Sequence, residues 1–146
     1  MAKTRETPAP TLPRAVVVHS LEQAEAALAA AADLDLPVTL ISAHNAGSIT
    51  GPGFFAELIR QARAAVPAAT SIALLDCQTA AGRAMAAVHG GMCDGVIYTG
   101  GHATFLKLAD IAMEKGMTTL DHRPEALDLA QRQDLHATVS AWLSRS

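Results

Sequence analysis

The chain has 146 residues, of which half are hydrophobic, 17% are charged and only 3% are aromatic. Its 14 acidic and 11 basic residues give a formal net charge of −3, and the basic residues are scattered along the chain. This composition argues against a nucleic-acid partner, because binding a polynucleotide needs clustered Lys and Arg with aromatic side chains among them. The length suits one domain with a single core.

The N-terminal stretch differs in composition from the rest of the chain. Residues 1–13 carry three prolines and mixed charges without apolar periodicity, so we expect a flexible tail there and a single α/β domain over 14–146. No apolar segment follows the charged start as in a signal peptide, and no apolar run approaches the ~20 residues of a membrane span. We therefore expect a cytoplasmic protein without a membrane partner, with Cys77 and Cys93 as free thiols.

From Arg14 onward, short apolar runs alternate with Ala-rich segments of helical length. The first four runs are apolar on both faces, which is typical of parallel strands covered by helices above and below. The fifth is more polar, so we expect it at an edge of the sheet. The predicted strands span residues 14–19, 37–42, 70–76, 94–99 and 117–122.

Helix signals lie between the predicted strands. Ser20 and Gln23 form a capping box in front of the Ala-rich segment that follows. Pro52 is predicted as the first residue of a second helix. A backbone N–H at that position has no acceptor within the helix, so proline forfeits no hydrogen bond there. Gly90 and Gly116 end the third and fourth helices, and two further helical pieces are expected after the proline at 124.

The strict alternation of strands and helices predicts a parallel sheet with right-handed crossovers. Five units are too few for an eight-stranded barrel. We expect an open, doubly wound, five-stranded sheet of the flavodoxin type, with strand order 2-1-3-4-5, and a half-barrel is the alternative. In open sheets of this kind, ligands bind outside the carboxyl ends of the strands.

Polar residues with chemical potential follow the predicted strands. Four of the six histidines, two carboxylates and a thiol fall at these positions, and we expect several of them to surround a common crevice. The candidate catalytic residues are Asp76, His19, His102 and Cys77. The candidate ligand-binding residues are His44, Asn45, Gly51, Gly53, Thr99, Gly100, Gly101 and Arg123.

The function we expect is binding of a small molecule or an anion, for example a phosphorylated ligand, at this carboxyl edge. The glycine-containing stretches 45–53 and 99–102 each run into a predicted helix, where backbone amides and the positive end of the helix dipole favour an anion. Plain turn chemistry would explain the glycines equally well. The reaction, if there is one, and any cofactor are not identified by the sequence.

A metal-dependent hydrolase is an alternative, since imidazole and carboxylate side chains suit zinc, iron or manganese. No local signature such as H-E-x-x-H occurs, so the ligands would have to come from separate strands. The residues available for such a site are His19, His44, Asp76, His102, Asp121 and His122.

Two further chemistries have some support. Cys77 follows a predicted strand and precedes a predicted helix, a position that can lower the pKa of a thiol, although an unpaired cysteine is more often a small buried apolar residue. The stretch "GPGFFA" (51–56) matches a dinucleotide-binding fingerprint with Asp76 as the ribose-binding acid. Gly51, however, lies nine residues beyond the preceding strand, too far for that motif.

Part of the pattern is similar to another kind of domain. An acid after the third strand (Asp76), a hydroxyl after the fourth (Thr99) and a basic residue before proline after the fifth (Arg123) resemble a response-regulator receiver. The resemblance implies a flavodoxin-like fold and a non-catalytic regulatory or interaction domain. The acidic pair expected after the first strand is replaced by His19 and a serine, and the family's lysine is absent, so the resemblance carries no phosphotransfer.

Two classes of function therefore remain, a small-molecule site at the carboxyl edge and a non-catalytic interaction domain. The histidines at the edge favour the first, and the lack of a complete catalytic set favours the second. The Ala-rich, weakly charged helices also favour association into a homo-oligomer, because apolar surface in excess of one core needs a partner.

Overall fold

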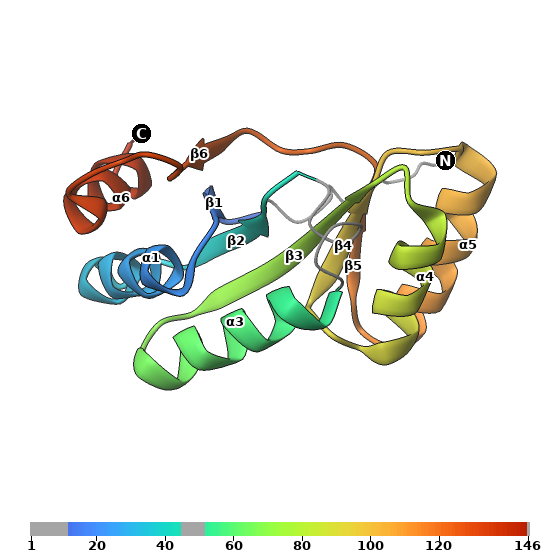
Figure 1. The fold of residues 1–146 in the computed structure, drawn as a ribbon, viewed down its shortest axis with the longest axis horizontal. Coiled ribbons are helices and arrows are strands. Elements are labelled where there is room, and N and C mark those ends of the chain that lie inside the picture. Colours follow the sequence, from blue (N-terminus) through green and yellow to red (C-terminus); the bar gives the residue numbers. More distant parts are fainter. Residues whose placement is uncertain (1–11, 45–51, 146) are drawn as a thin grey trace, which may run out of the picture.

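The computed structural model describes residues 12–44 and 52–145. It confirms the α/β alternation and the parallel sheet, which has six strands in the order β5-β4-β3-β2-β1-β6 (Figure 1). The strands are β1 (Ala15–Val18), β2 (Val38–Ser42), β3 (Ser71–Gln78), β4 (Gly95–Tyr98), β5 (Thr118–Leu120) and β6 (Ala126–Asp128). The helices are α1 (Leu21–Leu34), α3 (Pro52–Ala65), α4 (Ala81–Gly90), α5 (His102–Glu114) and α6 (Leu135–Leu143).

The predicted flavodoxin order, 2-1-3-4-5, and its doubly wound layers are wrong, as is the same fold implied by the receiver resemblance. Strands β1 to β5 lie side by side in chain order, so each connection advances in the same direction. Right-handed crossovers in one direction place every helix on one face. The half-barrel, which was the alternative expectation, also has its strands in chain order.

The two faces of the sheet are packed differently. The larger core cluster joins alternate strand residues to α1, α3, α4, α5 and α6. The smaller cluster, in the described part of the chain, holds strand residues and Leu12 but no helix residue. Its buried members are Ala15, Val17, Ile41, Leu74 and Ile97. We call this second side of the sheet the helix-free face.

The sixth strand corrects the sequence interpretation, which expected only helical pieces after the proline at 124. β6 pairs in parallel with β1, with Ala126 opposite Ala15 and Asp128 opposite Val17. A three-residue strand is too short to show periodicity, and pairing with β1 decides its conformation. β5 lies at the opposite edge of the sheet, as predicted from its polar character.

The connection from β5 to β6, residues 121–125, crosses the helix-free face from one edge of the sheet to the other. Leu120 and Ala126, which flank it, both pack against the cluster on that face. A flat sheet would separate the two edge strands by about five spacings of 4.8 Å, roughly 24 Å. Six residue steps of the chain reach at most about 20–22 Å, so the sheet must curve with its helix-free face inward.

This connection, which we call the strap, also obeys the handedness of the other crossovers. From β1 to β5 the chain advances across the sheet with helices on one face, and from β5 to β6 it returns across the opposite face. Reversing both the direction and the face preserves right-handedness. In Figure 1 the helices lie left of, below and right of the strands, and the strap runs above them.

Small residues allow close packing on the helix side. The buried face of α1 is built from alanines around Leu28, which lets the helix approach the sheet without large rings. The predicted start of α1 is confirmed: the Ser20 hydroxyl accepts from the Gln23 amide at 3.2 Å, and Gln23 Oε1 accepts from the His19 amide at 2.7 Å. Within the described residues, no helix combines the length and apolar character needed to cross a bilayer.

Gly95 is predicted to be essential for the pairing of β4 with β5. A side-chain carbon at this position would overlap the Thr118 carbonyl and lie 2.9 Å from the Leu74 side chain. We expect Gly95→Ala to lower the free energy of unfolding by about 2–4 kcal/mol, measured by urea denaturation. Gly82→Ala is the control: α4 has open space there, so the better helix former should be neutral or stabilise by up to about 1 kcal/mol. Equal effects of the two substitutions would contradict the packing described.

Candidate functional site

The carboxyl edge of the sheet carries three groups of polar side chains. Because all six strands are parallel, the residues that follow them lie along this one edge. Each group contains a His–Asp pair: His19 with Asp128 at the β1–β6 end, His44 with Asp76 at the centre, and His122 with Asp121 at the β5 end. The predicted histidines therefore share an edge, but they are distributed over separate groups.

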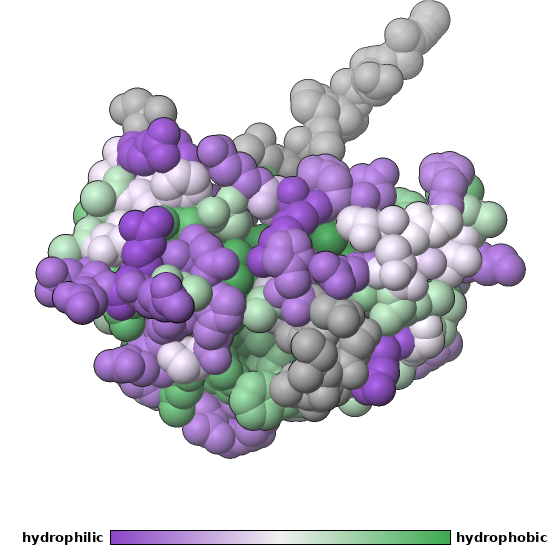
Figure 2. Space-filling view, turned by 45° about the horizontal axis from the view of Figure 1, so that its top comes forward, coloured by the Kyte–Doolittle hydropathy of each residue, from purple (hydrophilic) through white to green (hydrophobic). Residues whose placement is uncertain are grey.

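The central group is organised around a buried ion pair. Asp76 is 1% exposed and lies two residues beyond Leu74 in β3, so its side chain faces the helix-free side. Arg123, from the middle of the strap, donates through Nη1 to Asp76 Oδ2. Figure 2 shows hydrophilic side chains spread over this side of the molecule, with hydrophobic residues visible between them. The pair fastens the strap to the central strand.

A bulge at the end of β3 positions the other members of this group. Between Asp76 and Gln78, β3 advances two residues while β4 advances one, and Gln78 has a φ of 49°. That left-handed conformation costs a non-glycine residue about 1–2 kcal/mol, which the bond from the Gln78 amide to Asp76 Oδ1 at 2.9 Å helps to offset. The Gln78 side-chain amide then reaches His44 Nδ1 at 3.1 Å.

These contacts satisfy Asp76 from several sides. Its carboxylate accepts from Arg123 and from the Gln78 amide, and its own backbone amide donates to the Ser42 hydroxyl at 2.8 Å. His44 Nδ1 lies 3.6 Å from Asp76 Oδ2, beyond hydrogen-bond distance, and the imidazole is 64% exposed. The geometry gives Asp76 a structural role, and a catalytic role for it stays a prediction.

The group at the β1–β6 end is a hydrogen-bonded His–Asp pair. His19 Nε2 lies 2.7 Å from Asp128 Oδ1, and that oxygen also accepts from the Ala130 amide at 2.8 Å. Burial acts to raise the pKa of Asp128, but the Ala130 amide and His19 outweigh it, and the pKa is lowered overall. Asp128 is therefore a fixed carboxylate that orients the His19 ring.

A pocket of about 350 Å³ adjoins His19 between the start of α1 and the N-terminal three turns of α3. Leu21, Phe54 and Leu58 give the wall its apolar surface, and Glu57 and Gln61 are the polar residues that α3 contributes. The volume falls in the range of small-molecule sites, and a few polar groups on an apolar wall are typical of them. The lining residues are His19, Ser20, Leu21, Phe54, Glu57, Leu58 and Gln61.

The third group lies at the β4–β5 end of the edge. His122 Nδ1 contacts Asp121 Oδ1 at 3.0 Å, and this bond lowers the pKa of Asp121, with a smaller contribution from His102. All three side chains are exposed. Thr99 is also exposed and donates its amide to the Gln78 carbonyl at 2.8 Å, and Gly101 caps α5.

The glycine at position 100 is explained by packing. A side-chain carbon there would overlap the Tyr98 ring, so Gly100 lets that ring lie against the backbone. Gly53 lies in the first turn of α3 with open space around it. Asn45 and Gly51 lie outside the described residues.

Cys77 occupies a different environment from the one its predicted role requires. It lies within β3 and is fully buried in the core on the helix side, while the neighbouring Asp76 faces the opposite side. Burial raises the pKa of the Cys77 thiol to about 12, which opposes formation of the nucleophilic thiolate. The second cysteine, Cys93, is likewise free, and burial raises its pKa to about 12.

The described residues form no group of three or more His, Cys, Asp or Glu side chains suited to hold a metal ion. The His–Asp pairs contribute two such side chains each and belong to different strands. A structural or catalytic metal normally takes three or four protein ligands. The metal-dependent hydrolase has no geometric support among these residues.

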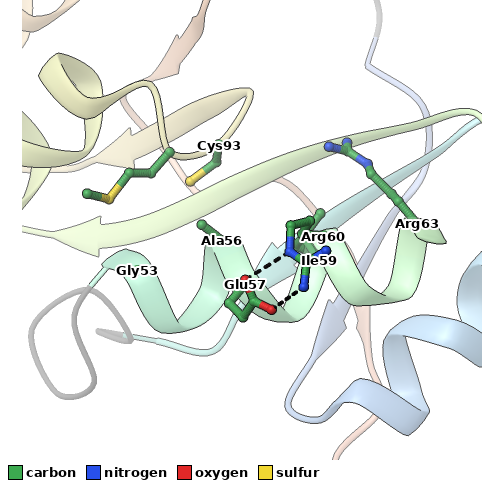
Figure 3. Close-up of a pocket in the computed structure, with 8 residues that line it drawn as sticks. Gly53, Ala56, Glu57, Ile59, Arg60, Arg63 and Cys93 are labelled. Carbon is green, nitrogen blue, oxygen red and sulfur yellow. Dashed lines mark hydrogen bonds and ion pairs between the residues drawn. The ribbon is translucent and has the colours of Figure 1, made fainter. Parts of the chain in front are cut away.

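A larger pocket of about 420 Å³ lies along the other side of α3, toward the loop before β4 (Figure 3). Its charged groups are already paired: Arg60 with Glu57 at 2.5 Å, and Arg63 with Asp94 at 2.6 Å. Its thiol, Cys93, has a raised pKa and is not a nucleophile at neutral pH. Size alone therefore does not make this pocket the better candidate.

Two members of these groups escaped the sequence analysis. Gln78 acquires its role only through the bulge, for which the sequence has no signal. Asp128 was placed in a helical piece, and only the pairing of β6 with β1 brings it beside His19. The spacing of 109 residues between Asp128 and His19 offers no local pattern that could have linked them.

Comparison with known proteins adds no assignment. No known protein-family model matches the chain, and no curated protein is similar to it in sequence. The functional conclusions therefore rest on the geometry of the carboxyl edge.

The ion pair between the strap and the central strand is predicted to dominate stability. Arg123→Ala would leave the Asp76 carboxylate buried without its partner, and we expect a loss of about 3 kcal/mol in the free energy of unfolding. Arg83, exposed on α4, is the control, since its change to Ala should cost within about 0.5 kcal/mol. Urea denaturation monitored by circular dichroism measures both. A cost for Arg123→Ala no greater than that of the control would show that the strap is held by other contacts.

Both thiols are predicted to be inert in the folded protein. At pH 8 a thiol of pKa about 12 is ionised in about 1 molecule in 10,000, against about a quarter for an ordinary cysteine. We expect negligible reaction with a thiol reagent such as Ellman's until urea unfolds the chain. Because the folded pKa values are raised, stability should fall as the pH rises above about 9. Rapid labelling of the folded protein would restore Cys77 as a candidate nucleophile.

Proposed function

We propose that this protein binds a small molecule at the carboxyl edge of its sheet, in the pocket between the start of α1 and the N-terminal three turns of α3. The observation that carries the proposal is a pocket of about 350 Å³ with Leu21, Phe54 and Leu58 on its wall. This volume is in the range of small-molecule sites, and an apolar wall with a few polar groups is typical of them. His19, at the carboxyl end of β1, also lines the pocket.

The position of the pocket supports the same function. Parallel α/β sheets bind ligands beyond the carboxyl ends of their strands, and His19 follows β1 directly at that end. The apolar wall includes Phe54, which is 59% exposed, the highest exposure among the large hydrophobic residues of α3. Burying this ring under a ligand would remove apolar surface from water and favour binding.

The phosphorylated ligand expected from the glycine-containing stretches has weaker support at this pocket. Glu57 lies on its wall, and burial of a phosphate next to a carboxylate is unfavourable. The first turn of α1 also contains Glu22, which offsets the positive end of that helix. We therefore favour a small molecule with an apolar body over a bare anion.

The proposal is tested by screening a fragment library with protein-observed NMR. We expect fragments with an aromatic or aliphatic body to shift the Leu21 and Leu58 methyl signals and the signals of His19. Phe54→Ala should weaken these fragments roughly fivefold or more, because a large part of the apolar wall is lost. Binding elsewhere on the molecule, with no shifts at these three residues, would refute the proposal.

Leu106→Ala is the matched control for that variant. Leu106 is also a large exposed apolar side chain, 50% exposed, but it lies on α5 near the opposite end of the sheet. Its loss should leave fragment affinities unchanged. Thermal melts of both variants check that the fold is intact.

A further inference from the structure

We propose that two copies of this chain associate through the β5 edge of the sheet, so that their β5 strands pair antiparallel and their α5 helices lie side by side. Two features carry the proposal: an open strand edge, and a stripe of exposed apolar side chains on the adjoining helix. Both lie toward the opposite end of the sheet from β1 and the pocket at α1. The proposal therefore does not depend on the proposed function.

The backbone of β5 is open on its outer side. β4 pairs with its inner side, and β5 is the last strand of the described sheet. The Thr118 amide donates to the carbonyl of Asp94, directly before β4, at 2.9 Å. Backbone groups alternate in direction along a strand, so the amide and carbonyl of Thr119 point away from β4. β5 contains neither Lys nor Pro, the residues that commonly block an edge against pairing.

The apolar stripe lies on α5. Leu106 and Met113 are 50% and 74% exposed, and the other described helices carry at most one large hydrophobic side chain with such exposure. The two residues are seven apart, which places them two turns apart on one side of the helix, with Ala109 between them. Single exposed apolar residues are ordinary, whereas a row of them marks a surface that is covered by a partner.

The stripe faces the same open side as the edge of β5. Leu108 is fully buried and faces the sheet, and Ala109 and Met113 follow it clockwise by roughly 100–140°, seen from the start of the helix. A right-handed crossover from β4 places β5 beneath this flank and α4 beside the other. His102 begins α5 on the same flank, and it contributes to the lowered pKa of Asp121, which directly follows β5.

A second copy is the partner that fits, because this edge is complementary to itself. A two-fold axis at Thr119 lets the amide of each copy donate to the Thr119 carbonyl of the other. Leu120 packs on the helix-free face, so the side chain of Thr119 lies on the helix side. The axis therefore brings both α5 helices together on one side of a continuous sheet. A three-residue strand edge alone is smaller than the usual interface of about 800 Å² per partner, so the apolar stripe is needed as well.

The charges on α5 also suit an antiparallel copy. Lys107, Asp110 and Glu114 are exposed, and none of them forms an ion pair with another described residue. Asp110 and Glu114 lie four residues apart, a spacing at which like charges repel each other. Reversing the second helix brings its Lys107 toward the half of the first that carries both acids, so the two copies offset each other's charge.

Sedimentation velocity of the full chain tests the association. At about 100 µM, where a dimer with a micromolar Kd is largely formed, we expect a mass near twice the 15.1 kDa of one chain, falling toward one chain on dilution. Amide exchange followed by NMR locates the contact. The Thr119 amide should exchange more slowly as the protein concentration rises, because it is bonded only in the dimer.

Two variants at the interface and one control identify the surface. Met113→Lys brings like charges into the contact and should weaken the dimer roughly tenfold or more. Thr119→Pro removes the outward amide, which makes no bond to β4, and should weaken it as well. Leu34→Lys is the control, a similar change at an exposed apolar residue of α1, and it should leave the mass unchanged. Circular dichroism checks that each variant is folded.

Three results would overturn the proposal. One is a mass of a single chain at every concentration. Another is a dimer that survives Met113→Lys, since the chain would then associate through a different surface. The third is fast exchange of the Thr119 amide in the dimer, which would exclude pairing of the β5 strands even if Thr119→Pro fails to fold.

Discussion

The ion pair between Asp76 and Arg123 is the contact on which the arrangement of the carboxyl edge depends. It joins the central strand of the sheet to a five-residue strap that would otherwise have little to hold it. A short connection between strands at opposite edges can only close if the sheet curves inward. The buried charge of Asp76 requires a partner at this place, and Arg123 supplies it from the middle of the strap.

The position of the strap determines the site at the other end of the edge. By returning the chain across the helix-free face, it places β6 beside β1 and brings Asp128 opposite Val17, two residues before His19. The Gln23 side chain connects the ends of β1 and β6, because it accepts from the His19 amide and donates to the Leu129 carbonyl. The His19–Asp128 pair is thus built by the first and last strands together.

Charge is balanced locally along the carboxyl edge, which narrows the chemistry of the site. The aspartates of the three groups each pair with a histidine, and Asp76 also pairs with Arg123. A fixed anion and cation that satisfy each other offer little to a ligand. What remains at the α1–α3 pocket is mainly its apolar wall, which favours a small molecule with an apolar body.

Local sequence determined the elements, and tertiary contacts decided their order and the site. Apolar runs and the capping box at Ser20 predicted four buried strands and the start of α1, because period and caps act over a few residues. The strand order could not be predicted, since parallel crossovers in either arrangement have the same local pattern. β6, the bulge at Gln78 and the pairing of His19 with Asp128 arise from contacts between distant segments. Burial of Cys77 against the helices, rather than at the edge, likewise depended on which face of β3 the helices cover.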